Sequence, residues 1–124
     1  MSRVMIIDDE LPIRRVLRRI LEQAGHTVLD VPDGLQGLAL WRKEPTNVVV
    51  TDIFMPEKDG IEVILEMNSF VPRPRIIAMS GGEQSGLFDL ISVALLLGAD
   101  RIILKPFNRR KFLETVYEVL DGQV

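Results

Sequence analysis

Reactive polar side chains follow four of the short apolar runs in this chain. Asp8 and Asp9 come directly after the first run, Asp52 ends a later one, and Ser80 and Lys105 follow two more. If the fold brings these residues together, the three carboxylates repel one another in a partly buried crevice unless a cation lies between them. We therefore expect a metal ion at this group of residues.

The chemistry of the side chains favours Mg²⁺ as that ion. Magnesium binds carboxylate and carbonyl oxygens and keeps several waters, so positions remain for phosphoryl oxygens. The chain has no cysteine and a single histidine, which argues against a zinc site built from thiolates or imidazoles. Beside such a metal, a carboxylate can attack phosphorus and form an acyl phosphate. Lys105 and the Ser80 hydroxyl can then stabilise charge on the phosphoryl oxygens.

The order of the elements explains why these residues are expected to meet. Apolar runs alternate with helical periodicities, which predicts an α/β fold: a doubly wound sheet of five parallel strands, each followed by a helix. The expected topology is flavodoxin-like, with strand order 2-1-3-4-5, and the binding crevice lies outside the carboxyl ends of the strands. Strands are predicted at 4–7, 27–31, 47–51, 75–79 and 101–104, and helices begin near Pro12, Gly34, Gly60, Leu87 and Asn108.

Length and composition limit the function classes. The chain has 124 residues, of which 47% are hydrophobic, so we predict a single domain over 1–124. No apolar run is long enough to span a bilayer, and the first strand leads directly into acidic residues rather than a cleavage site. We expect a cytoplasmic protein without membrane insertion. The net charge of −3 and the lack of a recognition module argue against direct nucleic acid binding.

The residues at the predicted strand ends resemble those of response-regulator receiver domains, which act in two-component signalling. In that family an acidic pair follows the first strand, the phospho-acceptor ends the third, Ser or Thr ends the fourth, and Lys-Pro follows the fifth. All four features are present, and the resemblance runs over essentially the whole chain. The segments 55–60 and 98–100 also resemble loops of the family.

The resemblance implies a role for each residue of the acidic group. Asp52 is the expected phospho-acceptor. Asp9 and Asp52 are expected to bind Mg²⁺ directly, Asp8 largely through water, and the Phe54 backbone carbonyl is expected to supply a further ligand.

The resemblance also covers the residues that read out phosphorylation. Ser80 and Lys105 are expected to contact the phosphoryl group, and the Lys105–Pro106 peptide bond is expected to be cis. Two features depart from the family pattern. Ile102 stands where the family usually has a Tyr or Phe as a rotamer switch, and the stretch between Ser80 and Lys105 is longer than usual, with Gly81-Gly82 adding freedom that could displace the fourth helix.

The predicted function is that of a phosphoprotein switch in a two-component or phosphorelay system. Phosphorylation would shift a conformational equilibrium that controls partner binding. The expected phosphoryl donor is a sensor histidine kinase or a histidine phosphotransfer protein. The expected partner after phosphorylation is a downstream target protein or an output domain, and a homodimer is possible. The chain is not expected to be an enzyme for outside substrates, although slow self-dephosphorylation by water is expected.

The predicted first helix carries a row of arginines. Arg14, Arg15, Arg18 and Arg19 form one polar face opposite the apolar stripe. This face is either simply solvated or a docking surface for an acidic or helical partner. In the receiver family the first helix commonly meets the kinase or phosphotransfer domain.

Three other functions remain as alternatives. A nucleotide- or flavin-binding domain would need a glycine- or hydroxyl-rich loop after the first strand, where this chain has Asp8-Asp9-Glu10. A small-molecule phosphohydrolase would place two aspartates two residues apart on the first strand, which the adjacent Asp8 and Asp9 do not fit. A receiver-like interaction module that is never phosphorylated is the third alternative. The complete set of site residues argues against it, and Ile102 leaves it open.

Overall fold

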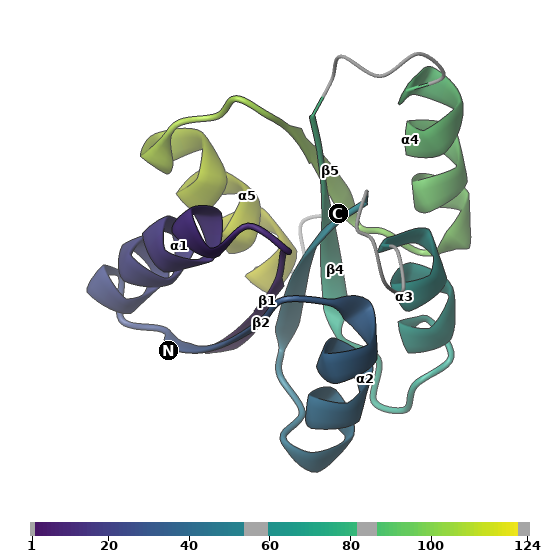
Figure 1. Cartoon of the computed structure of the whole chain (residues 1–124), viewed down its shortest axis with the longest axis horizontal. Helices are drawn as coiled ribbons and strands as arrows, with labels where there is room; N and C mark the ends of the chain where they lie inside the picture. The colour runs from purple at the N-terminus through teal and green to yellow at the C-terminus, as the bar shows by residue number, and fades with distance from the viewer. Residues whose placement is uncertain (1, 54–59, 82–86, 122–124) are drawn as a thin grey trace.

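The β-branched runs of the sequence pair as one parallel sheet in the order β2-β1-β3-β4-β5 (Figure 1). This is the predicted order, so the flavodoxin-like topology is confirmed. The computed structural model describes residues 2–53, 60–81 and 87–121. The strands are β1 (Arg3–Ile7), β2 (Thr27–Val31), β3 (Val48–Asp52), β4 (Arg75–Ser80) and β5 (Arg101–Leu104).

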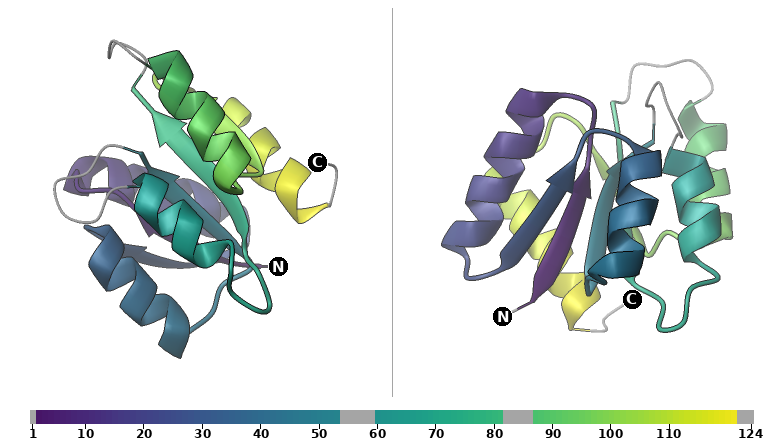
Figure 2. Two further views of the ribbon diagram at one scale, coloured as in Figure 1. Left: turned by 90° about the vertical axis from the view of Figure 1, so that its right-hand side faces the viewer. Right: turned by 60° about the horizontal axis from the view of Figure 1, so that its bottom comes forward.

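Helices cover both faces of the sheet (Figure 2). α1 and α5 pack on one face and α2, α3 and α4 on the other, with separate apolar clusters beneath each group. Within the described ranges, no helix combines the length and the apolar character that crossing a bilayer requires. The helices are α1 (Leu11–Gln23), α2 (Gly34–Lys43), α3 (Gly60–Met67), α4 (Leu87–Leu97) and α5 (Arg109–Leu120).

Burial on both faces explains why the central strands are continuous apolar runs rather than alternating ones. On β1, Met5 and Ile7 enter the cluster under α2, α3 and α4, whereas Val4 and Ile6 enter the cluster under α1 and α5. Trp41 is buried in the first of these clusters.

Local capping chemistry sets the helix boundaries that the sequence predicted. The Asp33 and Asn108 side chains each accept a 2.8 Å hydrogen bond from the backbone N–H three residues later, at the starts of α2 and α5. Gly25 and Gly98 follow α1 and α4 with φ of 96° and 130°, a conformation that glycine adopts without steric cost. These signals are local in sequence, which is why they could be recognised before the fold was known.

The register of the strands brings their carboxyl ends to one edge of the sheet. Ile7 lies opposite Thr51 in the β1–β3 pair, Asp52 opposite Met79 in the β3–β4 pair, and Ser80 opposite Leu104 in the β4–β5 pair. The residues that end or follow these strands are therefore neighbours in space, as the topology predicted.

His26, in the turn between α1 and β2, gives a prediction about stability and pH. Its Nδ1 atom is buried without a hydrogen-bond partner among the described residues. Burial, and to a smaller extent repulsion from the N-terminal ammonium, lowers the pKa of His26. The unfolded chain therefore binds this proton more readily, so stability should be lost as pH falls from the ordinary histidine pKa through the lowered one.

His26→Gln should consequently lose less stability than the wild type between about pH 7.5 and pH 5, a range around the ordinary histidine pKa. Urea unfolding at each pH measures the difference. Parallel stability curves for the two proteins would show that His26 does not contribute to the acid sensitivity.

Candidate functional site

Three carboxylates meet at the carboxyl ends of β1 and β3. Asp8, Asp9 and Asp52 each offer an oxygen that lies within 4.8 Å of the oxygens offered by the other two. Asp8 is fully buried and Asp52 is 7% exposed, whereas Asp9 is exposed to solvent. The structure therefore brings together three of the residues predicted from sequence, in a place where their mutual repulsion is poorly screened.

Lys105, directly after β5, supplies one positive charge to this group. Its Nζ atom lies 3.3 Å from Oδ2 of Asp8 and 3.4 Å from Oδ2 of Asp52. One ammonium offsets one of the three negative charges, so the group keeps a net negative charge. That charge favours the binding of a further cation.

The pKa of Lys105 follows from the same geometry. Burial by itself lowers the pKa of an ammonium, but the Coulombic attraction of Asp52 and Asp8 outweighs burial, so the pKa of Lys105 is raised. Lys105 therefore remains protonated throughout the physiological pH range. It is a permanent cation beside the proposed acceptor.

Ser80, the last residue of β4, adds a hydroxyl group to the same edge of the sheet. The residue is fully buried, and its Oγ atom has no hydrogen-bond partner among the described residues. Its backbone carbonyl accepts a 2.7 Å hydrogen bond from the Lys105 N–H, which joins the two strand ends. A buried hydroxyl without a partner costs about 1 to 3 kcal/mol, so this hydroxyl is a candidate donor to a ligand.

The remaining predicted residues have different outcomes. The Lys105–Pro106 peptide bond is cis, as predicted. Ile102 is partly buried and packs against the cluster under α2, α3 and α4. Phe54 and the 55–59 segment lie outside the described residues, as do residues 82–86, on which the predicted displacement of the fourth helix depends.

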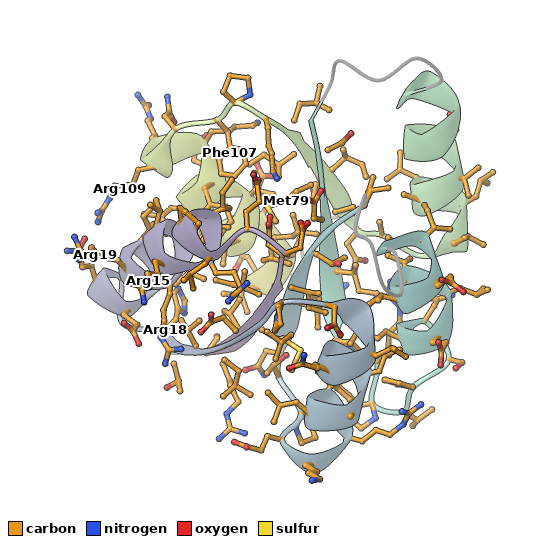
Figure 3. The ribbon with its side chains drawn as sticks, viewed as in Figure 1. Arg15, Arg18, Arg19, Met79, Phe107 and Arg109 are labelled. Carbon is orange, nitrogen blue, oxygen red and sulfur yellow. The ribbon has the colours of Figure 1, made fainter. Side chains whose placement is uncertain are left out.

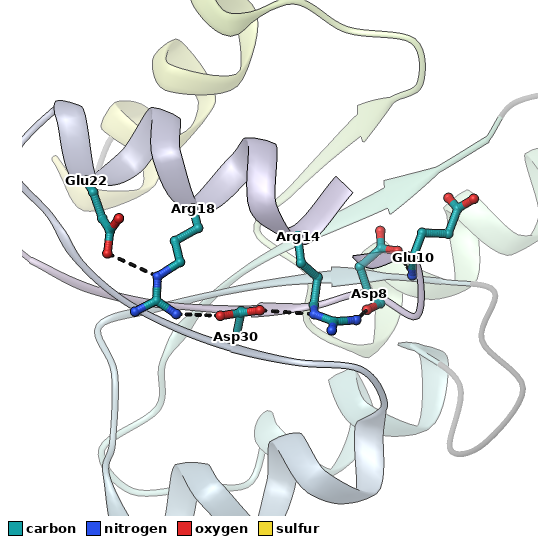
Figure 4. A network of polar contacts seen from close by, with 6 residues as sticks. All are labelled: Asp8, Glu10, Arg14, Arg18, Glu22 and Asp30. Carbon is teal, nitrogen blue, oxygen red and sulfur yellow. Dashed lines mark hydrogen bonds and ion pairs between the residues drawn. The ribbon is translucent and has the colours of Figure 1, made fainter. Parts of the chain in front are cut away.

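The arginines of α1 do not behave as one solvated face. Arg14 and Arg18 both form ion pairs with Asp30 of β2 (Figure 4), and the Arg14 side chain is only 13% exposed. Arg15 and Arg19 are exposed and form no ion pair with any described residue. The choice between a solvated face and a docking surface therefore concerns Arg15 and Arg19 alone.

Two residues near the site were not recognised as important from sequence. Arg14 Nη1 donates a 2.8 Å hydrogen bond to the backbone carbonyl of Asp8. Gly60, the first residue of α3, donates from its N–H to the Ile53 carbonyl at 2.9 Å, and a Cβ atom there would lie 2.2 Å from the carbonyl oxygen of Asp52. The sequence signal for Gly60 was its place in the 55–60 segment, while Arg14 carried no signal that distinguished it from its neighbours.

Comparison with known proteins shows which family this fold and group of residues belong to. The sequence profile described as "Response regulator receiver domain" matches residues 4–117. The chain belongs to this family. Receiver domains are signalling domains of two-component systems that interact with kinases and output domains, and they are not enzymes that turn over outside substrates.

Individual relatives agree with this assignment. The chain is 34% identical to "Protein CcdB" of Bacillus subtilis, with 97% of this receiver domain and 98% of the relative covered. It is 35% identical to the "Probable transcriptional regulator ycf27" of Porphyridium aerugineum, covering 96% of this chain and 48% of that protein, so it spans about half of such longer relatives. A CheY-like receiver domain from Methanospirillum hungatei superposes with a TM-score of 0.91 at 31% identity, covering 99% and 96% of the two chains.

The close approach of α3 to the end of β3 gives a prediction for Gly60. In Gly60→Ala the new Cβ meets rigid backbone, so we expect a loss of about 1 to 3 kcal/mol in the free energy of unfolding, as for other overpacked sites. Gly37→Ala is the matched control, because its Cβ meets the flexible end of the Ile7 side chain at 2.6 Å. Urea denaturation compares the two, and equal losses would refute the proposed backbone clash.

Proposed function

We propose that Asp52 accepts a phosphoryl group from the phosphohistidine of a sensor histidine kinase or a histidine phosphotransfer protein. The observation that carries this proposal is the meeting of Asp8, Asp9 and Asp52 with the Lys105 ammonium at one edge of the sheet. The proposal treats 1–124 as one receiver domain, which the family match over 4–117 supports.

Magnesium fits the donor set at this edge. The grouped side chains offer only carboxylate oxygens, and Asp9 faces solvent, so waters can complete the coordination. In our proposal Asp9 and Asp52 bind the ion directly, Asp8 acts largely through water, and the Phe54 carbonyl contributes a further ligand. The bound ion would neutralise charge on the phosphoryl oxygens.

In the transfer step, one residue of this chain acts as the nucleophile and two others contact the phosphoryl oxygens. A carboxylate oxygen of Asp52 attacks phosphorus and forms a P–O bond, while the P–N bond to the donor imidazole breaks and its electron pair stays on nitrogen. Lys105, already 3.4 Å from Asp52, pairs with one phosphoryl oxygen, and the Ser80 hydroxyl donates to another. The resulting acyl phosphate is hydrolysed slowly by water, so the active state limits its own lifetime.

Phosphorylation then acts by shifting a population. New contacts of Ser80 and Lys105 with the phosphoryl group favour one of two arrangements of the face formed by α4, β5 and α5. A change from mostly inactive to mostly active requires a preference on the order of 5 kcal/mol. With Ile102 in place of an aromatic residue, the change does not involve an aromatic flip.

The same face offers contacts for a target. Leu96, Leu104 and Tyr117, from α4, β5 and α5, are 84%, 49% and 68% exposed. Exposed apolar and aromatic side chains of this kind are frequent in protein interfaces. We propose that a downstream protein, an output domain or a second copy binds here. Direct nucleic acid binding is not part of the proposal, and the cytoplasmic location stays a prediction.

Ile102 is also compatible with a second candidate function. A receiver-like module that binds its partner without being phosphorylated would not need the aromatic switch, and Ile102 packs into the core instead. The acidic group and the buried Ser80 hydroxyl favour the phosphorylated switch over this second function.

Phosphorylation with acetyl phosphate tests the acceptor. The wild type should gain one phosphoryl group in the presence of Mg²⁺, and Asp52→Asn should gain none, because the amide is not a nucleophile toward phosphorus. Intact-mass measurement follows the adduct. Asp33→Asn is the matched control, since an asparagine caps a helix as well as an aspartate does.

The outcomes separate the two candidate functions. An adduct that persists in Asp52→Asn would place the acceptor elsewhere. A wild type that gains no phosphoryl group from acetyl phosphate or from a phosphorylated histidine kinase would support the phosphorylation-independent module.

We further propose that the donor docks beside α1. An apolar hollow of about 560 Å³ lies next to the site, between α1 and the segment after β5. Figure 3 shows Arg15, Arg19 and Arg109 on the same side of the molecule, and Arg109 donates a 2.7 Å hydrogen bond to Gln23 at the end of α1. An apolar hollow with arginines on the same side of the molecule (Figure 3) fits a helical donor whose contact surface is apolar with acidic residues around it. The hollow is lined by Pro12, Ile13, Val16, Leu17, Gly81, Lys105, Pro106 and Phe107.

Charge reversal tests this docking. Arg15→Glu should lower the rate of transfer from a histidine kinase by on the order of tenfold at low salt, because rim charges mainly affect association rates. Phosphorylation by acetyl phosphate should be unchanged. Lys43→Glu, the same reversal at an exposed residue of α2 on the opposite face, is the control. Equal effects of the two substitutions would show that net charge, and not a docking surface, governs the rate.

A further inference from the structure

The turn that carries Asp8 and Asp9 is held in place by a side chain of α1. Arg14 Nη1 donates a 2.8 Å hydrogen bond to the Asp8 carbonyl, and Arg14 Nε donates a 3.0 Å hydrogen bond to Oδ2 of Asp30. The two contacts use the planar fork of one guanidinium, as Figure 4 shows. One side chain thus connects the end of β1 to β2.

Further hydrogen bonds complete the restraint on this turn. The Asp8 N–H donates to the Val31 carbonyl at 3.2 Å, and Oδ1 of Asp8 accepts a 2.8 Å hydrogen bond from the Glu10 N–H. The backbone of Asp8 is therefore held on both sides, its N–H by β2 and its carbonyl by Arg14. Because the carbonyl of Asp8 belongs to the peptide that leads into Asp9, this contact also orients the exposed Asp9.

Arg18 provides a natural comparison within the same group. It also forms an ion pair with Asp30 and a second one with Glu22, but none of its contacts within the described part of the chain involves Asp8. Arg14 and Arg18 thus share one carboxylate partner and differ in whether they touch the acidic turn. The Arg14 side chain is 13% exposed and that of Arg18 is 42% exposed.

We propose that Arg14 is a positioning residue for the metal site. Its guanidinium, fixed by Asp30, holds the Asp8–Asp9 turn in the orientation that a divalent cation requires. This inference rests on the proposed function, since it assumes that Mg²⁺ binds the acidic group. Magnesium demands nearly ideal octahedral geometry, and loss of a group that orients metal ligands typically costs about 10- to 100-fold in affinity.

The sign of the effect distinguishes positioning from simple charge. Arg14 is a cation close to the carboxylates, so removing it by charge alone would strengthen Mg²⁺ binding. Positioning predicts the opposite result. Arg14→Met should weaken Mg²⁺ binding about tenfold, although the variant has lost a positive charge.

The test measures the Mg²⁺ dissociation constant by calorimetry for the wild type, Arg14→Met, Arg14→Lys and Arg18→Met. Arg18→Met should bind Mg²⁺ like the wild type, because it breaks the other ion pair of Asp30 and leaves Asp8 untouched. Arg14→Lys keeps the charge but cannot bridge Asp8 and Asp30 with a planar fork, so it should also bind Mg²⁺ more weakly. If Arg14→Met does not fold, Arg14→Lys alone tests the positioning role.

A second readout uses acetyl phosphate at increasing Mg²⁺ concentration. Arg14→Lys should need more Mg²⁺ to reach half of its maximal phosphorylation rate and should then reach the rate of the wild type. Urea unfolding in the absence of Mg²⁺ should show a larger stability loss for Arg14→Met than for Arg18→Met, because Arg14 is the more buried and also bonds to the Asp8 carbonyl.

The outcomes distinguish a failure of the positioning role from a failure of the proposed metal site. Wild-type Mg²⁺ affinity in both Arg14 variants would overturn the positioning role and leave the proposed function intact. Tighter binding in Arg14→Met would show that Arg14 acts only through its charge. A wild type that does not bind Mg²⁺ would overturn the proposed metal site and the positioning role together.

Discussion

Repulsion among three carboxylates is the constraint on which the rest of this structure depends. Asp8 and Asp52 are buried at the ends of adjacent central strands, and Asp9 lies beside them. Nothing in the stability of the sheet requires charges there, since an apolar or hydrogen-bonded residue would end either strand at lower cost. The fold tolerates this cost because Lys105 provides a partial counter-charge, and a bound cation would provide more.

Contacts from the surrounding elements hold the three carboxylates in place. Gly60 lets α3 approach the backbone at the end of β3, and Lys105 joins the end of β5 to the acids of β1 and β3. Arg14 connects the acidic turn to β2. The carboxylates are therefore held by contacts from strands on both sides of the site and from helices. Their relative positions depend on the pairing of the whole sheet.

Most of the fold was predictable because its signals are local. The β-branched runs, the caps at Asp33 and Asn108, and the glycines after α1 and α4 indicated the elements to within a residue or two. The alternation of strand and helix indicated a doubly wound parallel sheet, and the flavodoxin-like fold class gave the order 2-1-3-4-5. The meeting of Asp8, Asp9 and Asp52 followed from that order, because the carboxyl ends of parallel strands share one edge.

Lys105 was predicted as a site residue, but the contacts of Arg14 could not be predicted in the same way. Helical spacing placed Arg14 and Arg18 on a polar face, but their shared ion-pair partner, Asp30, comes from β2 and reaches α1 only through the pairing of β2 with β1. Ser80 itself was expected at the site, but the burial of its hydroxyl without a hydrogen-bond partner among the described residues becomes apparent only in the structure.

The single tryptophan lies at the opposite end of the sheet from the acidic cluster. Trp41 Nε1 donates a 3.1 Å hydrogen bond to Thr46, just before β3 begins, and its ring stacks on Phe70 with centroids 5.0 Å apart. Asp52 ends that same strand, about 13 Å further along at the usual rise per residue. Trp41 emission therefore reports on the packing of the core at that end of the sheet. A fluorophore introduced beside the acidic cluster would report on cation binding, so that one sample can report loading and unfolding in separate optical channels.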